Sequence, residues 1–98
     1  MGNRDAIAAV RQYKKLVLAH FDQATIYLFG SYGKGTAHPD SDIDVAVVLP
    51  EVKEDFLEAS SKLWALTWQV NTLIEPVLID KRYPSPLYED VLKTGVLV

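Results

Sequence analysis

The chain carries the sequence GSYGKGTAHPDSDID at residues 30–44, between two apolar stretches. The first stretch, Ala24–Phe29, is rich in aromatic and β-branched residues and stops at a glycine, which is typical of a buried strand. In the second, Asp42–Leu49, apolar side chains occupy every second position from Ile43 on, which predicts another strand. Glycine, proline and small polar residues predict a long loop over residues 30–41 between the two strands.

The remaining elements follow from the spacing of apolar residues and from helix-capping signals. They are three helices and a strand: a helix over Arg4–His20, a helix over Glu54–Val70, a strand over Ile74–Ile79, and a helix that begins at Ser85-Pro86 and ends at Gly95. The resulting order is helix, strand, strand, helix, strand, helix. It predicts a single α/β (or α+β) domain over residues 1–98, in which helices flank a small mixed β-sheet.

Composition limits the classes of protein to which the chain can belong. With 98 residues, of which 49% are hydrophobic, it can bury one modest core. Because it has no cysteine, disulfides, thiolate metal sites and cysteine nucleophiles are excluded, which fits a cytoplasmic protein. No apolar run approaches the roughly 20 residues that span a bilayer, so we expect no membrane association. The formal charge of -3 argues against general nucleic-acid binding, because such binding relies on clustered Lys and Arg.

Asp42 and Asp44 form the first candidate site. Alternate side chains of a strand share a face, so the two carboxylates project together from α-carbons roughly 6 to 7 Å apart. Two carboxylates held about 4 Å apart would repel by roughly 4 kcal/mol at an effective dielectric constant of about 20. A divalent cation removes this conflict, and Mg²⁺ or Mn²⁺ suits hard oxygen ligands. The alternative is a solvated strand start that follows the turn residues Asp40 and Ser41.

Gly30 and Ser31 form the second candidate site, a turn that would bind phosphate. A glycine at the end of a strand lets the backbone turn sharply and approach a ligand, while the serine offers a hydroxyl and a backbone N–H. Lys34, between two further glycines, offers a positive charge for the triphosphate of a nucleotide. The alternatives are an ordinary turn after a strand and an exposed loop lysine.

The Gly-Ser pair at residues 30–31 and the Ser-Asp-Ile-Asp run at residues 41–44 resemble the signature of the DNA polymerase β-like nucleotidyltransferase superfamily. The short length resembles its minimal nucleotidyltransferase branch. The resemblance implies the nucleotidyltransferase fold and the transfer of a nucleoside monophosphate from a nucleoside triphosphate. It also implies that Ser31 binds the triphosphate, that Asp42 and Asp44 hold the metals, and that a third carboxylate activates the acceptor hydroxyl.

Glu75 is the candidate for that third carboxylate and for a further metal ligand, because it begins the third expected strand where the family carries Asp or Glu. Pro76 follows it and cannot donate a hydrogen bond to a sheet, so the strand must begin late or lie at an edge. Asp80 is the other candidate. On an unbroken strand, however, its side chain would point to the face opposite that of Glu75.

The function that we expect is the transfer of an adenylyl group from ATP to a hydroxyl acceptor. A chain this short has little room for a domain that binds the acceptor, so a second protein is expected to present it. Minimal nucleotidyltransferases are similar to the antitoxins of two-component modules, and this resemblance implies AMP transfer to a small helical HEPN-type toxin. The alternatives are a non-catalytic module that senses nucleotide or inhibits its partner, and an enzyme that modifies a small molecule such as an antibiotic.

Three features outside the motif carry weaker expectations. Trp64 and Trp68, four residues apart on an expected helix, are predicted to pack in the core, with a protein interface as the alternative. His20 and His38 are too isolated to form a metal site and are predicted to be structural or exposed. The apolar residues 96–98 are expected either to form a strand against the body of the protein or to belong to a contact surface.

Overall fold

The computed structural model describes residues 3–37 and 41–98 and has a four-stranded sheet with helices on both faces. The elements in this part of the chain are α1 (Asn3–His20), β1 (Thr25–Phe29), α2 (Gly30–Lys34), β2 (Ile43–Leu49), α3 (Phe56–Thr67), β3 (Ile74–Asp80), α4 (Pro86–Thr94) and β4 (Val96–Leu97). The strand order is β3-β2-β1-β4. Because β1 is antiparallel to β2 and β4 while β2 and β3 are parallel, the predicted mixed sheet flanked by helices is confirmed.

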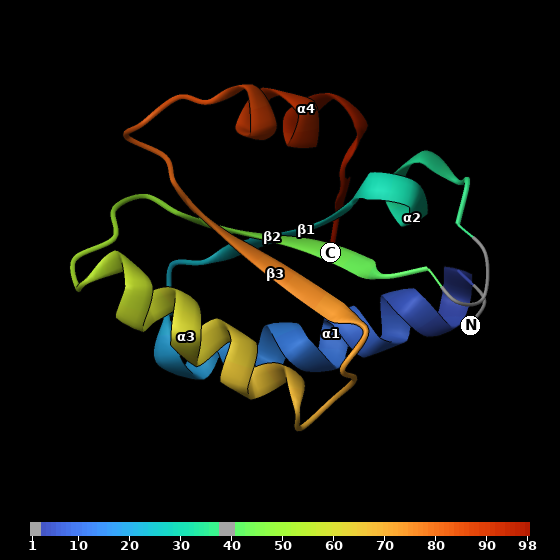
Figure 1. Ribbon diagram of the computed structural model, residues 1–98, viewed down its shortest axis with the longest axis horizontal. Helices are drawn as coiled ribbons and strands as arrows, with labels where there is room; N and C mark the ends of the chain where they lie inside the picture. Colours follow the sequence, from blue (N-terminus) through green and yellow to red (C-terminus); the bar gives the residue numbers. More distant parts are fainter. Residues whose placement is uncertain (1–2, 38–40) are drawn as a thin grey trace.

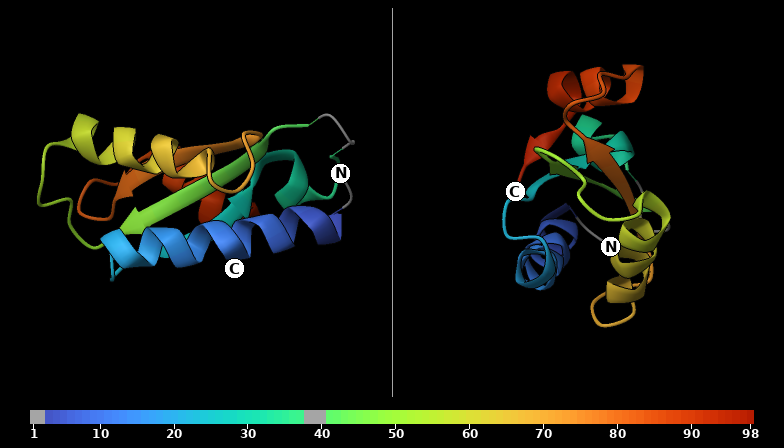
Figure 2. Two further views of the ribbon diagram at one scale, coloured as in Figure 1. Left: turned by 90° about the horizontal axis from the view of Figure 1, so that it is seen from below. Right: turned by 90° about the vertical axis from the view of Figure 1, so that its left-hand side faces the viewer.

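The helices form two layers on opposite faces of the sheet (Figure 1). α1 and α3 lie side by side on one face, and α4 lies over the other (Figure 2). The buried Tyr13 hydroxyl of α1 donates to the carbonyl oxygen of Leu63 in α3 at 2.7 Å. Burial raises the pKa of Tyr13 above its ordinary value, so the hydroxyl keeps its proton and the bond joins the two helices. Among the described residues, none of the helices combines the length and the apolar character that crossing a membrane requires.

The alternation of side chains along β2 assigns its residues to the two layers. Val45 and Val47 are fully buried in the apolar core formed with α1 and α3. Ala46 and Val48 belong instead to the smaller apolar cluster under α4. Because Asp44 precedes Ala46 by two positions, its side chain points to the α4 face. The alternation predicted for this strand is therefore confirmed.

The edge position of β3 explains how the strand accommodates Pro76. The Ile43 N–H donates to the Leu73 carbonyl at 2.8 Å, and the Lys81 N–H donates to the Leu49 carbonyl at 2.9 Å. In a parallel ladder with this register, odd-numbered residues of β3 direct their backbone groups toward β2, and even-numbered residues direct theirs outward. Proline, which lacks an N–H, occupies an outward position and removes no bond to β2.

Helix boundaries follow local capping. Asp55 accepts a hydrogen bond from the Glu58 N–H at 3.1 Å, so α3 begins at Phe56, two residues later than the sequence predicts. The start predicted for α4 is confirmed, because the Ser85 hydroxyl accepts from the Tyr88 N–H at 3.2 Å and Pro86 occupies the first turn. Gly95 ends that helix as predicted.

The structure corrects one loop prediction and decides between the two alternatives for the C-terminal residues. The segment expected to be a loop over residues 30–41 begins with the short helix α2. At the C-terminus, the strand alternative is confirmed for residues 96–97, which pair with β1 as β4. The Val98 N–H then donates to the Ile26 carbonyl at 3.0 Å. This contact holds the chain end against the sheet.

Trp64 and Trp68 do not pack in the core as predicted. Their side chains are 45% and 80% exposed, because the face of α3 that meets the sheet is formed by Ala59, Leu63 and Leu66. The wide apolar face of this helix is thus divided into a buried half and an exposed half. His20 is exposed, as predicted, whereas His38 and Asp40 lie outside the described residues.

Replacing Trp68 with serine is expected to change the free energy of unfolding by less than about 0.5 kcal/mol, because most of the side chain is already in water. Leu63→Ala on the same helix is the matched contrast and should cost about 2–5 kcal/mol, because Leu63 is fully buried. Urea unfolding of the isolated chain measures both. A loss of several kcal/mol for Trp68→Ser would contradict the exposed position.

Candidate active site

The two candidate sites and Glu75 lie in one row across the sheet. The antiparallel pairing places Phe29 opposite Asp44, and the parallel pairing places Asp44 beside Glu75. Neighbouring strands lie about 4.8 Å apart, and paired residues point to the same face. Asp44 and Glu75 are therefore neighbours on the α4 face. The Gly30-Ser31 pair directly follows Phe29 at the other end of this row.

The three acidic residues influence one another electrostatically. Burial raises the pKa of Asp44, and the negative charge of Asp42 raises it further. The pKa of Glu75 is raised by burial first, then by the charges of Asp42 and Asp44. A side-chain hydrogen bond with Asp42 adds to this shift, because only the protonated form of the pair can make it. The three carboxylates are thus close enough that their mutual repulsion disfavours ionisation of Asp44 and Glu75.

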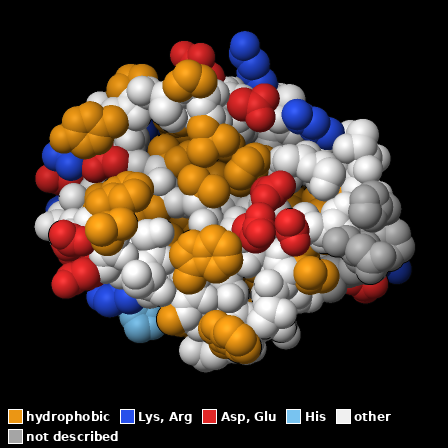
Figure 3. Space-filling model, in the orientation of Figure 1, with side chains coloured by type: hydrophobic (Ala, Val, Ile, Leu, Met, Phe, Trp, Pro, Cys, Tyr) orange, Lys and Arg blue, Asp and Glu red, His pale blue; other side chains and the backbone are white. Residues whose placement is uncertain are grey.

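The chemistry of this acidic group fits a divalent cation. Hard oxygen ligands that repel one another are what Mg²⁺ or Mn²⁺ stabilises, and none of the ion pairs described in the structure involves Asp42, Asp44 or Glu75. Within residues 3–37 and 41–98, no three acidic or histidine side chains already surround one point as the ligands of a filled site do. A cation would therefore have to draw the carboxylates closer together. Figure 3 shows a group of acidic side chains on the surface where β2 and β3 begin.

Gly30 brings the start of α2 against Asp44. Its backbone is left-handed, with φ 64°, and a β-carbon at this position would overlap the Asp44 carboxylate. Only glycine adopts this backbone conformation without strain and also leaves room for the carboxylate. The Gly-Ser turn and the first candidate site are therefore in direct contact, although they are far apart in the loop sequence.

The rest of α2 presents polar groups beside this contact. Ser31 is partly exposed at the second position of the helix, and its carbonyl accepts from the Thr36 N–H at 2.9 Å. Lys34 is exposed in the last turn. Gly33 has a packing role, because a β-carbon there would press on the backbone carbonyls of Leu28 and Thr94.

Asp80 lies away from the acidic group and has a different environment. It is the last residue of β3, and its side chain is only 7% exposed. Its carboxylate accepts hydrogen bonds from the Val52 N–H at 3.1 Å and from the Arg82 N–H at 3.0 Å. It also forms an ion pair with the Arg82 guanidinium at 2.8 Å. Of the two candidates for a third carboxylate, the structure thus brings Glu75, and not Asp80, next to Asp44.

Asp80→Asn is expected to lower the melting temperature at pH 7 by about 5 °C. Hydrogen bonds from Arg82 hold the pKa of Asp80 well below its ordinary value. This contribution to stability is complete above the unfolded-state pKa of about 3.9 and is lost as the pH falls toward the folded-state value. The difference in melting temperature between the two proteins should therefore shrink below about pH 4. Thermal unfolding between pH 3 and pH 8 measures it, and a difference independent of pH would contradict the assignment.

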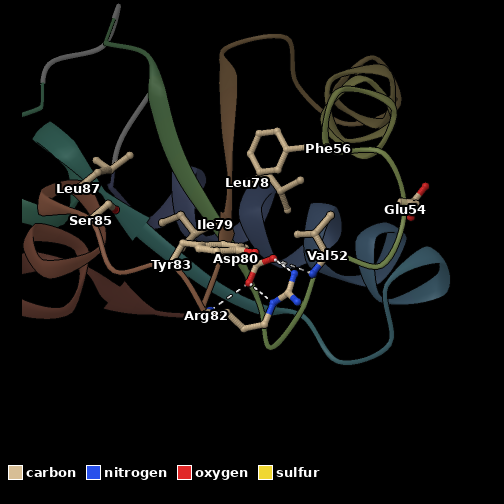
Figure 4. Close-up of a pocket in the computed structure, with 10 residues that line it drawn as sticks. All are labelled: Val52, Glu54, Phe56, Leu78, Ile79, Asp80, Arg82, Tyr83, Ser85 and Leu87. Atoms are coloured by element: carbon tan, nitrogen blue, oxygen red, sulfur yellow. Dashed lines mark hydrogen bonds and ion pairs between the residues drawn. The ribbon is translucent and has the colours of Figure 1, made fainter.

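A cavity of about 370 Å³ lies at the far end of β3, and sequence reasoning did not find it. Its apolar walls include Phe56 at the start of α3, Tyr83 in the loop after β3 and Leu87 in α4 (Figure 4). These residues come from three segments that no motif connects. Only the placement of both helices beside an edge strand brings them together, so the sequence held no signal for this cavity.

Comparison with known proteins identifies the family of the chain. Residues 10–94 match the family model described as nucleotidyltransferase domain. The chain belongs to the nucleotidyltransferase domain family. The match includes the Gly-Ser turn, the Asp-x-Asp pair and Glu75, and the predicted resemblance to this family is confirmed. No curated protein sequence matches the chain.

Solved structures of similar proteins share the nucleotidyltransferase fold. A candidate nucleotidyltransferase from Sulfolobus solfataricus is 21% identical, with 95% of this chain and 85% of that chain covered and a TM-score of 0.65. A chain of the toxin–antitoxin complex MntA–HpeT, in a mutant form, is 30% identical, with coverage of 90% and 69% and a TM-score of 0.65. A chain of the complex between tri-AMPylated Shewanella oneidensis HEPN toxin and MNT antitoxin is 25% identical, with coverage of 94% and 70% and a TM-score of 0.64.

Proposed function

We propose that this nucleotidyltransferase domain transfers AMP from ATP to a hydroxyl group of a partner polypeptide. The observation that carries the proposal is the row formed by the Gly30-Ser31 turn, Asp44 and Glu75 on one face of the sheet. It sets groups suited to phosphate beside groups suited to a divalent cation. The partner class that we propose is a HEPN-type toxin, because both of the similar complexes described above contain a toxin and one of these toxins is an AMPylated HEPN protein.

Each residue of the proposed site has its own role in the reaction. The Ser31 hydroxyl and N–H would bind the triphosphate, with Lys34 as a second, exposed contact. Asp42, Asp44 and Glu75 would hold Mg²⁺ or Mn²⁺, which supplies positive charge to the transferred phosphoryl group and its leaving group. The acceptor oxygen forms a bond to the α-phosphorus as the bond to pyrophosphate breaks. Glu75, at the outer end of the row, would accept the hydroxyl proton.

Incubation with α-labelled ATP and Mg²⁺ tests the proposal. The purified chain is used alone and with the proteins that co-purify with it, and the intact mass of every species is measured. We expect one protein partner to gain AMP, and the gain to be lost in Asp42→Asn. A tight complex in which the partner is never labelled, but is neutralised equally by wild type and Asp42→Asn, would instead establish a non-catalytic binding module.

A further inference from the structure

We propose that the cavity at the end of β3 binds an apolar side chain of the acceptor polypeptide, which lies extended along the outer edge of this strand with its hydroxyl at the carboxylates. The inference rests on the proposed function and adds to it the class of acceptor segment. Three features of the described residues carry it: the apolar walls of the cavity, the free backbone of the edge strand and the distance to Glu75.

Six of the ten residues that line the cavity are apolar, and the other four are Glu54, Asp80, Arg82 and Ser85. Phe56, Tyr83 and Leu87 are 48%, 66% and 40% exposed although their side chains face a common hollow (Figure 4). Leu78 and Ile79 of β3 also line it. Its volume of about 370 Å³ lies at the lower end of the range of ligand pockets, roughly 300–1,000 Å³. The cavity therefore suits an apolar side chain.

The cavity is held in shape without a ligand. Asp80 accepts from the Val52 N–H and pairs with Arg82, which ties the segment before α3 to the loop after β3. The Arg82 guanidinium lies over the ring of Tyr83, 5.1 Å from its centroid, and pairs with Glu51 at 3.3 Å. These contacts fix both rims, so binding would require little ordering of the protein.

The backbone beside the cavity is available for pairing with a polypeptide. Even-numbered residues of β3 direct their backbone groups outward, but the Asp80 carbonyl already accepts from the Tyr83 N–H at 3.0 Å. Pro76 has no N–H to offer. Leu78, which lines the cavity, directs both its N–H and its carbonyl outward, and neither group takes part in the turn, loop and cap hydrogen bonds of the described residues. An extended segment can pair with such an edge, whereas a small apolar molecule gains nothing from it.

The spacing connects the cavity to the site of transfer. Leu78–Asp80 lie about three to five residues beyond Glu75 on one strand, which corresponds to roughly 10–16 Å. Hydrophobic side chains gather between α4 and α3 next to the acidic group on the same face of the molecule (Figure 3). A partner segment whose hydroxyl residue and apolar residue are about four positions apart would therefore reach both sites.

Synthetic peptides of about twelve residues, built from glycine, glutamine and lysine with one tyrosine as acceptor, test the spacing. One peptide has leucine four positions from the tyrosine, one has it ten positions away, and one has none. With the wild-type chain, ATP and Mg²⁺, the first peptide should be modified with about tenfold higher kcat/KM than the others. Peptide mass gives the rates.

Two leucines of α4 provide the matched variants. Leu87→Lys should abolish the preference for the first peptide and leave the KM for ATP unchanged, because Leu87 lines the cavity. Leu92→Lys changes a leucine of similar exposure outside the cavity and should keep the preference. Equal rates for all peptides, or a raised KM for ATP in Leu87→Lys with the preference retained, would overturn the inference.

The partner-labelling reaction, run in parallel, separates the two proposals. If the partner gains AMP but the peptides are not distinguished, the cavity does not select the acceptor and only this inference fails. If neither partner nor peptide is labelled by the wild-type chain, the proposed function fails and the inference fails with it.

Discussion

Replacing Asp44 with asparagine is expected to abolish AMP transfer and, at the same time, to make the metal-free protein more stable. Transfer should fall at least about a hundredfold, because fixed electrostatic contacts to a reacting group contribute on that scale. The free energy of unfolding should rise by about 0.5 kcal/mol, as for a partly screened charge pair, because one of three neighbouring negative charges is removed. Intact mass measures the transfer, and urea unfolding in EDTA measures the stability.

Asp22→Asn is the control for this experiment, because Asp22 is an exposed carboxylate in the turn before β1. It should change neither transfer nor stability. Adding Mg²⁺ should raise the stability of the wild-type chain more than that of Asp44→Asn, since a ligand that binds the folded state more tightly stabilises it more. If Asp44→Asn is less stable than wild type in EDTA, the Asp44 carboxylate has a stabilising partner in the folded protein. The repulsion among the carboxylates, which is the main argument for the proposed metal site, would then be contradicted.

Part of the carboxylate row could be predicted from sequence, because it depends on the alternation of one strand and on the properties of one proline. Alternation along β2 determines that Asp44 and Ala46 share a face. The restriction that Pro76 places on a sheet implied a late start or an edge strand, and the edge position is confirmed. With the strand at the edge and beginning at Ile74, Glu75 keeps its place beside Asp44. Local rules thus placed Asp44 on its face, whereas the choice of Glu75 came from the family resemblance and its position beside Asp44 depends on the pairing of two strands.

Features that depend on several segments could not be predicted in this way. Trp64 and Trp68 lie on the side of α3 away from the sheet, which the apolar spacing of the helix could not predict. Periodicity assigns residues to one face of a helix but does not determine which element packs against that face. Helix α2 has only five residues, three of them glycine or serine, and its propensity is poor. It forms where Gly33 lets it pack closely on the backbone near Leu28 and Thr94, which is a tertiary effect.

Gly30→Ala is expected to lower AMP transfer by about a hundredfold, because a displacement of about 1 Å at a reacting centre has an effect of this size. The new methyl group would occupy the space of the Asp44 carboxylate and would push it out of the row. The positive φ of 64° adds about 1–2 kcal/mol of backbone strain. Transfer rates and urea unfolding measure the two effects separately.

Gly35→Ala separates strain from displacement, because Gly35 also has a positive φ, 75°, but a β-carbon there would meet no atom within 4 Å. It should lose about 1–2 kcal/mol, which is the cost of the positive φ alone, and keep transfer within about threefold of wild type. Gly30→Ala should then cost more stability than Gly35→Ala in the wild-type chain, but about the same in an Asp44→Ala background, where the carboxylate is absent. Equal losses in both backgrounds would show that the methyl group does not act through Asp44. The displacement of the Asp44 carboxylate by the new methyl group would then be wrong as the reason for any loss of transfer.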